Sequence, residues 1–175
     1  MAIKVGDKIP SMTLHVMGDK GPEAISTDDL FADKIVAMFG VPGAFTPTCS
    51  EKHLPGYVAN ADKFREYGAD DIVCVSVNDA FVMHAWGKDQ GAEDKVTMVA
   101  DGSAKFTRAV GLELDLSDHG LGVRCQRFAM IIENGVVKDV EIEPKPGEAV
   151  KSTAEKMLEK MAKAYLGRGT AKTGV

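Results

Sequence analysis

The sequence is poor in cysteine, and its three cysteines lack the spacing of a redox or zinc motif. Cys49, Cys74 and Cys125 are far apart, and no Cys-x-x-Cys pair occurs. These absences argue against a disulfide framework, a zinc ribbon and a dithiol oxidoreductase. No apolar run approaches the ~20 residues that a bilayer span requires. The 21 Lys and Arg residues are outnumbered by 26 Asp and Glu residues, giving a net charge of −5. We therefore expect neither a membrane nor a nucleic-acid partner.

The chain length and its first residues set the expected organisation. A chain of 175 residues corresponds to one domain. We expect that domain to span residues 1–167, followed by a flexible tail at 168–175. The first residues, MAIKVGDKIP, show no charged segment followed by an apolar one. Secretion and organelle import are therefore not signalled, which predicts a cytoplasmic protein with reduced thiols.

Hydrophobic patterning predicts strands that alternate with helices. The strands are expected at 11–16, 35–39, 72–77, 96–99, 128–132 and 136–140. Helices are expected at 27–31, at 47–67 with an interruption at Pro55-Gly56, after a cap at Asn78 or Asp79, between Ser103 and Gly111, and from the capping box Ser152-x-x-Glu155. Asn134-Gly135 predicts a hairpin between the last two strands. This order favours one α/β domain, a mixed central β-sheet flanked by helices on both faces.

The segment from Gly40 to Cys49 leaves a buried strand and enters a helix, a position where ligand sites occur in α/β sheets. Thr46 followed by Pro47 fits an N-cap with proline at the first helical position. Cys49 then falls in the first turn, near unpaired backbone N–H groups and the positive end of the helix dipole. These surroundings favour a thiolate.

The helix end alone is too weak to ionise a thiol fully. Making a cysteine mostly thiolate at neutral pH requires about 3.4 kcal/mol. A helix end contributes ~0.3–1 kcal/mol when exposed and about 2 kcal/mol in partly buried sites. A cationic partner is therefore needed. Arg127 begins a predicted core strand, where a surface charge is not usually placed, so we expect it to be that partner.

Several segments together resemble one family. They are VPGAFTPTC at 41–49, HLPGYV at 53–58, VSVND at 75–79, LELDLSD at 112–118 and RFAMIIENGVV at 127–137. The chain resembles the peroxiredoxins, thiol peroxidases of thioredoxin-like fold, and is most similar to their type II, peroxiredoxin-5-like branch. The resemblance extends from Lys4 to Leu166.

The resemblance implies a role for each motif residue. Cys49 would be the peroxidatic cysteine, which attacks hydrogen peroxide or an organic hydroperoxide and becomes a sulfenic acid. Thr46 would offer its hydroxyl to the peroxide, and Pro42 would shield the sulfur from water. Arg127 would stabilise the thiolate and the departing oxygen. No cofactor or metal is implied.

The resemblance also implies partners. Some relatives carry a resolving cysteine late in the chain, but residues 143–153 contain none. Cys74 lies in a predicted buried strand, and Cys125 could approach the site two residues before Arg127; neither is expected to resolve the sulfenic acid. We therefore expect recycling by an external thiol, either glutathione with glutaredoxin or thioredoxin. A homodimer is also implied.

His53 and three aromatic residues allow more than one interpretation. His53, four residues after Cys49, could suggest a metal site or a hydrolase dyad, but no other histidine has matching spacing. A polar residue near the mouth of a pocket is the simpler interpretation. Phe45, Phe81 and Trp86 fit core packing, and the resemblance also suggests them for a dimer contact. A non-catalytic redox sensor that uses Cys49 oxidation as a switch is the alternative function.

Overall fold

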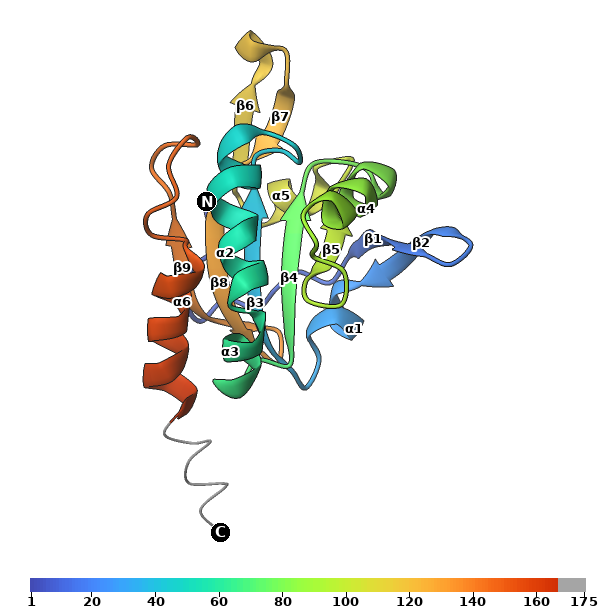
Figure 1. Cartoon of the computed structure of the whole chain (residues 1–175). Helices are drawn as coiled ribbons and strands as arrows, with labels where there is room; N and C mark the ends of the chain where they lie inside the picture. The colour runs from blue at the N-terminus through green and yellow to red at the C-terminus, as the bar shows by residue number, and fades with distance from the viewer. Residues whose placement is uncertain (167–175) are drawn as a thin grey trace.

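A seven-stranded mixed sheet forms the centre of the molecule (Figure 1). The computed structural model describes residues 1–166, so the tail predicted at 168–175 lies outside the described residues. In spatial order the strands are β2 (Gly21–Ser26), β1 (Thr13–Gly18), β5 (Thr97–Ala100), β4 (Asp71–Ser76), β3 (Ile35–Val41), β8 (Phe128–Glu133) and β9 (Val136–Ile142). A separate hairpin pairs β6 (Glu113–Leu116) with β7 (Gly122–Cys125).

The middle of the sheet is parallel and its edges are antiparallel. β3 pairs with β4, and β4 with β5, in parallel, whereas β8 runs antiparallel to β3. β3 and β4 are almost continuously apolar because helices cover both of their faces. The register aligns Val41 with Ser76, so the carboxyl ends of these two strands lie at the same edge of the sheet.

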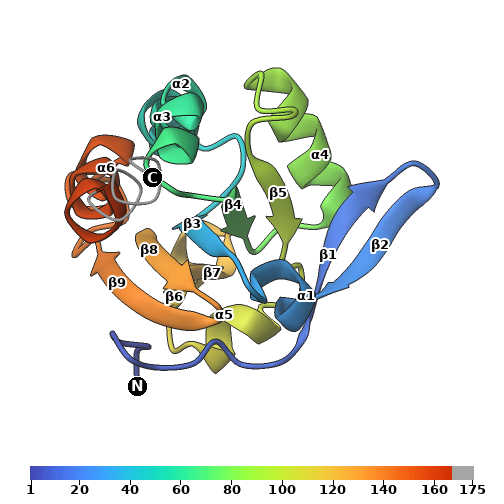
Figure 2. The same ribbon diagram turned by 90° about the horizontal axis from the view of Figure 1, so that it is seen from below.

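Two layers of helices enclose the sheet, as Figure 2 shows. One face carries α2 (Leu54–Ala59), α3 (Ala61–Glu66), α4 (Ala80–Asp89) and α6 (Ala154–Met161). The other face carries α1 (Thr27–Phe31) and α5 (Lys105–Ala109). Each face has its own buried apolar cluster. The predicted fold class, a mixed sheet between helices with a thioredoxin-like arrangement, is confirmed. Within residues 1–166, no helix combines the length and apolarity needed to cross a bilayer.

The helix predicted at 47–67 is irregular, but not at Pro55-Gly56, where the interruption was predicted. It continues through Pro55-Gly56, which lie inside α2. The departure from α-helical geometry comes one turn earlier, in a π-helical turn over Cys49–His53, where the Leu54 N–H donates to the Cys49 carbonyl. Proline has no N–H to donate to the carbonyl four residues before it, so a wider turn precedes it naturally. A second break follows at Asn60.

Two predicted helix caps are wrong. Ser103 does not cap α5; the buried Asp101 carboxylate accepts from the backbone N–H groups of Phe106 and Thr107 instead. The capping box at Ser152 is also wrong, because Thr153 caps α6 by accepting from the Lys156 N–H. Asp79 caps α4 as predicted.

The predicted hairpin between β8 and β9 is present. Its turn residues, Asn134 and Gly135, have φ values of 49° and 78°, as a two-residue turn of this hand requires. The strand β2 and the hairpin β6–β7 were not predicted. β2 and β7 lack a regular alternation of buried and exposed positions, and the alternation in β6 extends over only four residues, so the periodicity signal is weak there.

Candidate active site

The loop after β3 delivers the motif residues to the edge of the sheet. β3 ends at Val41, and Pro42 and Gly43 are buried behind it. Phe45 adopts a φ of 66°, which is uncommon for a bulky side chain and turns the chain into the helix. The helix begins at Pro47, and the Thr46 carbonyl accepts its first backbone bond, from the Ser50 N–H at 2.9 Å. The N-cap and proline positions are therefore those that the sequence predicts.

Cys49 lies in the first turn and faces a buried arginine. Cys49 is 0% exposed and belongs to the apolar cluster beneath α2 and α6. Nη2 of Arg127 donates to Cys49 Sγ at 3.1 Å. The structure thus brings together the two residues that the electrostatic argument paired. The guanidinium is permanently charged, so this contact places a fixed positive charge at the sulfur.

Arg127 is held by several partners although it is only 2% exposed. Its Nε and Nη2 groups both donate to the Pro146 carbonyl, at 3.2 and 3.0 Å. Its Nη1 group contacts Nδ1 of His53 at 3.0 Å. These bonds fix the plane of the guanidinium, so its orientation toward the sulfur is set before any substrate arrives.

His53 is a buried part of the arginine network, not a polar residue near a pocket mouth. It is 1% exposed, and its Nε2 lies 3.0 Å from the Ser152 carbonyl, which can only accept. Nε2 therefore carries the proton, and Nδ1 accepts from Arg127. Burial, reinforced by the Arg127 charge, lowers the pKa of His53 to about 3. With both ring nitrogens engaged, His53 cannot act as the base of a hydrolase dyad.

Thr46 lies in the loop after β3, and Arg124 contacts the same loop. The Thr46 hydroxyl donates to the Gly43 carbonyl at 2.6 Å, so its oxygen still has lone pairs available to accept a hydrogen bond. Arg124, from β7, places Nη1 3.4 Å from the Pro42 carbonyl. A Cβ atom on Gly43 would lie 2.9 Å from the same Nη1, so a side chain at this position would displace the end of the Arg124 side chain.

The other two cysteines are also buried, Cys74 in the apolar cluster that contains Cys49 and Cys125 in the cluster on the other face of the sheet. Cys74 lies within β4, where burial raises the pKa of its thiol well above the ordinary value. Cys125 ends β7, whereas Arg127 lies between β7 and β8, so the two residues are not on one strand and the approach expected from their two-residue spacing is wrong. Its thiol donates to the neighbouring Gln126 carbonyl, it packs in the cluster on the opposite face of the sheet, and burial raises its pKa as well.

Sequence reasoning missed the groups that support Arg127. The carbonyls of Pro146 and Ser152 come from the loop between β9 and α6: Pro146 is 19 residues from Arg127, and Ser152 is 99 residues from His53. Backbone atoms leave no trace in side-chain patterns. The contact between Trp86 Nε1 and Ser50 Oγ, 3.0 Å long, was also missed. Trp86 is 0% exposed, so its suggested place in a dimer contact is wrong.

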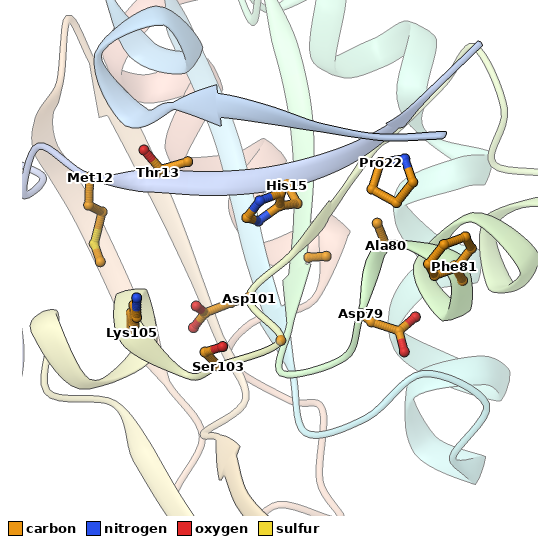
Figure 3. A pocket seen from close by; sticks show the side chains of 12 residues that line it. Met12, Thr13, His15, Pro22, Asp79, Ala80, Phe81, Asp101, Ser103 and Lys105 are labelled. Carbon is orange, nitrogen blue, oxygen red and sulfur yellow. The ribbon is translucent and has the colours of Figure 1, made fainter. Parts of the chain in front are cut away.

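A separate cavity of about 650 Å³ opens between β1 and the starts of α4 and α5 (Figure 3). It is lined by residues that include His15, Asp79, Phe81 and Lys105. None of the four predicted site residues lines it. Across residues 1–166, no group of three or more His, Cys, Asp or Glu side chains could hold a metal ion.

Comparison with known proteins gives consistent matches. The redoxin family model matches residues 4–158. Peroxiredoxin-2E, a chloroplastic protein of Arabidopsis thaliana, is 47% identical over 161 residues, covering 90% of this chain and 68% of that protein. The crystal structure of reduced Prx3 from Vibrio vulnificus in complex with hydrogen peroxide is 49% identical, with a TM-score of 0.86 and coverage of 91% and 99%. Peroxiredoxin 5 from Alvinella pompejana is 37% identical, with a TM-score of 0.81 and coverage of 92% and 99%.

Proposed function

The chain belongs to the redoxin family, in the type II, peroxiredoxin-5-like branch of the peroxiredoxins, and on that premise we propose that Cys49 is its peroxidatic cysteine. As a peroxiredoxin it is a thiol peroxidase with an antioxidant function. The observation that carries the assignment is the 3.1 Å contact between Arg127 Nη2 and Cys49 Sγ. Hydrogen peroxide and organic hydroperoxides are the proposed substrates, and the Vibrio relative was crystallised with hydrogen peroxide.

The proposed reaction is a two-electron oxidation of Cys49. The thiolate attacks the terminal oxygen of the peroxide, so an S–O bond forms while the O–O bond breaks. The sulfur becomes a sulfenic acid, and the departing oxygen takes up a proton to leave as water or an alcohol. Arg127 contributes at both ends, because its guanidinium faces the sulfur and can stabilise the negative charge that develops on the leaving oxygen.

Thr46 and Pro42 would position the peroxide. The Thr46 proton is committed to the Gly43 carbonyl, so Oγ1 presents lone pairs that can accept the hydrogen of a peroxide O–H group. This bond would orient the O–O axis toward the sulfur. Pro42 has no N–H group and is buried beside the loop, which keeps its ring as an apolar wall.

Recycling is proposed to use an external thiol. Two equivalents of thiol convert the sulfenic acid back to the thiol, with release of one water and one disulfide. Glutathione with glutaredoxin, or thioredoxin, would supply these electrons. Because Cys49 is fully buried, a reductant of that size reaches the sulfur only after the π-helical turn Cys49–His53 opens. A reducing compartment such as the cytoplasm fits this chemistry and the three free cysteines of residues 1–166.

A homodimer is proposed through the surface beside the loop. Phe45 and Phe81 are 53% and 64% exposed, although both are large apolar residues. Their segments are joined because the Asn78 side chain accepts from the Ala44 N–H at 3.0 Å. Sedimentation equilibrium of the wild-type chain and of Phe81→Asp tests this, since a dimer that persists unchanged in the variant would contradict the proposed contact.

Stopped-flow oxidation of the reduced protein by hydrogen peroxide, followed by intact-mass analysis with a sulfenic-acid trap, tests the function. We expect a rate orders of magnitude above that of free cysteine, lost in Cys49→Ser but retained in Cys74→Ser. Continuous turnover with glutathione and glutaredoxin distinguishes a peroxidase from the alternative, a redox sensor that is oxidised once. A rate no faster than free cysteine would overturn both.

A further inference from the structure

Glu143 is a buried acid that the proposed reaction does not use. Glu143 follows β9 directly, is 4% exposed, and its N–H donates to the Arg127 carbonyl at 2.9 Å. Both residues therefore lie at the same end of the β8–β9 hairpin. No ion pair joins their side chains within residues 1–166, although each would be a natural counterion for the other.

The carboxylate of Glu143 binds the backbone of the loop instead. A single oxygen, Oε2, accepts from the N–H groups of Val150, Lys151 and Ser152 and from the Ser152 hydroxyl, at 2.7–2.8 Å. Charge-assisted bonds of this kind are the strong ones in proteins. Four of them on one atom fix the end of the loop 144–152 just before α6 begins.

The same loop supplies the acceptors that orient the active site. Its Pro146 carbonyl takes two hydrogen bonds from Arg127, and its Ser152 carbonyl takes one from His53 and one from Tyr57. The loop thus turns three N–H groups toward the Glu143 carboxylate, the Pro146 carbonyl toward Arg127, and the Ser152 carbonyl toward the histidine that contacts Arg127. This arrangement keeps the two charges apart, so that Nη2 of Arg127 stays available to Cys49.

The second oxygen of Glu143 differs from the first. Among residues 1–166, Oε1 is buried and has no hydrogen-bond partner. An unpaired buried acceptor destabilises a fold. A glutamine could place its oxygen where Oε2 lies and leave its amide nitrogen at the unpaired position, which makes it the conservative replacement.

We propose that Glu143 is a positioning residue of the peroxidase site, which acts through the loop 144–152 to hold His53 against Arg127 and to orient Arg127 toward Cys49. This rests on the proposed function of Cys49. Glu143 does not touch the sulfur, so its loss leaves the reacting atoms in place. Loss of Glu143 instead removes the bonds that anchor the loop, whose carbonyls hold the guanidinium. A preorganised donor that is misoriented slows the reaction.

The test compares Glu143→Ala and Glu143→Gln with a matched control, Glu141→Ala. Glu141 is a carboxylate two residues earlier, and its bond to Lys160 at 2.9 Å joins β9 to α6 without touching the loop. Each reduced full-length variant is mixed with hydrogen peroxide in a stopped-flow instrument, and the Cys49-dependent thiolate absorbance at 240 nm is recorded at neutral pH.

We expect Glu143→Ala to react about tenfold more slowly with a smaller thiolate absorbance, and Glu143→Gln to stay within about threefold of the wild type. Glu141→Ala should keep the wild-type rate. If Glu143→Ala does not fold, Ser152→Ala carries the test, because it removes one of the four donors and should slow the reaction about threefold.

If Glu143→Ala reacts at the wild-type rate, the positioning role of Glu143 is overturned and the proposed function stands. If Glu143→Ala does not fold, a wild-type rate in Ser152→Ala has the same consequence. Loss of rate in Glu143→Gln equal to that in Glu143→Ala would also overturn the positioning role. A wild-type rate no faster than free cysteine would instead overturn the proposed function, on which the inference depends.

Discussion

Nδ1 of His53 lies 3.0 Å from Nη1 of Arg127, and a neutral imidazole accepts this bond from the same guanidinium that donates to Cys49. A protonated imidazole would place two N–H groups against each other in a buried space. The histidine must therefore stay neutral so that the arginine keeps its orientation.

This requirement predicts how stability depends on pH. Burial and the Arg127 charge lower the pKa of His53 to about 3, against 6.5 for an ordinary histidine. The unfolded chain therefore binds a proton that the folded chain excludes. The contribution to stability is complete above pH 6.5 and is lost as the pH falls toward 3, by about 1 kcal/mol per pH unit. Urea unfolding at pH 7, 6 and 5 measures this slope. His53→Gln should flatten it, and an unchanged slope in that variant would contradict the assignment.

Replacing Arg127 by lysine should reduce activity although the charge is kept. Arg127 makes two bonds to the Pro146 carbonyl, one to His53 and one to Cys49, and a single ammonium group cannot reach these three partners at once. We expect Arg127→Lys to react with hydrogen peroxide about 100-fold more slowly than the wild type. Arg124→Lys is the matched control, because the hydrogen bonds that Arg124 makes within residues 1–166 go to the backbone carbonyls of Leu121 and Pro42 and not to Cys49. Equal losses in both variants would show that orientation at Cys49 is not the cause.

The fold could be predicted largely from the sequence because its signals are local. The apolar run at 35–39 and the Asn134-Gly135 turn each determine an element through their own residues. Errors arose where a distant group replaces a local one. Ser152 has the sequence of a helix cap, but its hydroxyl and N–H are taken by Glu143, so the cap moves to Thr153.

The active site was predictable only in part for the same reason. Cys49 and Arg127 could be paired from charge and position, because an ionised thiol needs a cation nearby. The role of His53 could not be predicted, because its neutral state depends on burial and on the Ser152 carbonyl, which is 99 residues away in sequence. The displacement of the helix irregularity from Pro55 to the turn containing Cys49 likewise depends on how the missing proline N–H is accommodated.

Trp86 should report on the state of the cysteine. It is the only tryptophan in the chain, it is fully buried, and its Nε1 donates to Oγ of Ser50, the residue after Cys49. Any opening of the π-helical turn stretches this bond and changes the surroundings of the indole ring. We expect a change in tryptophan fluorescence during oxidation by hydrogen peroxide. The change should be absent in Cys49→Ser and smaller in Ser50→Ala. A full-sized signal in Cys49→Ser would contradict the link to the cysteine.

The remaining cysteines should be dispensable for turnover. Cys74 and Cys125 are at most 1% exposed, and burial raises the pKa of each thiol, so neither is a ready nucleophile at neutral pH. Cys125 also packs in the cluster on the face of the sheet opposite to the one that holds Cys49. We expect Cys74→Ser and Cys125→Ser each to keep at least about half of the wild-type rate with glutathione and glutaredoxin. Intact-mass analysis after one equivalent of peroxide provides the second readout: a gain of one oxygen fits external recycling, whereas a loss of two hydrogens within one chain would identify an internal disulfide and contradict this prediction.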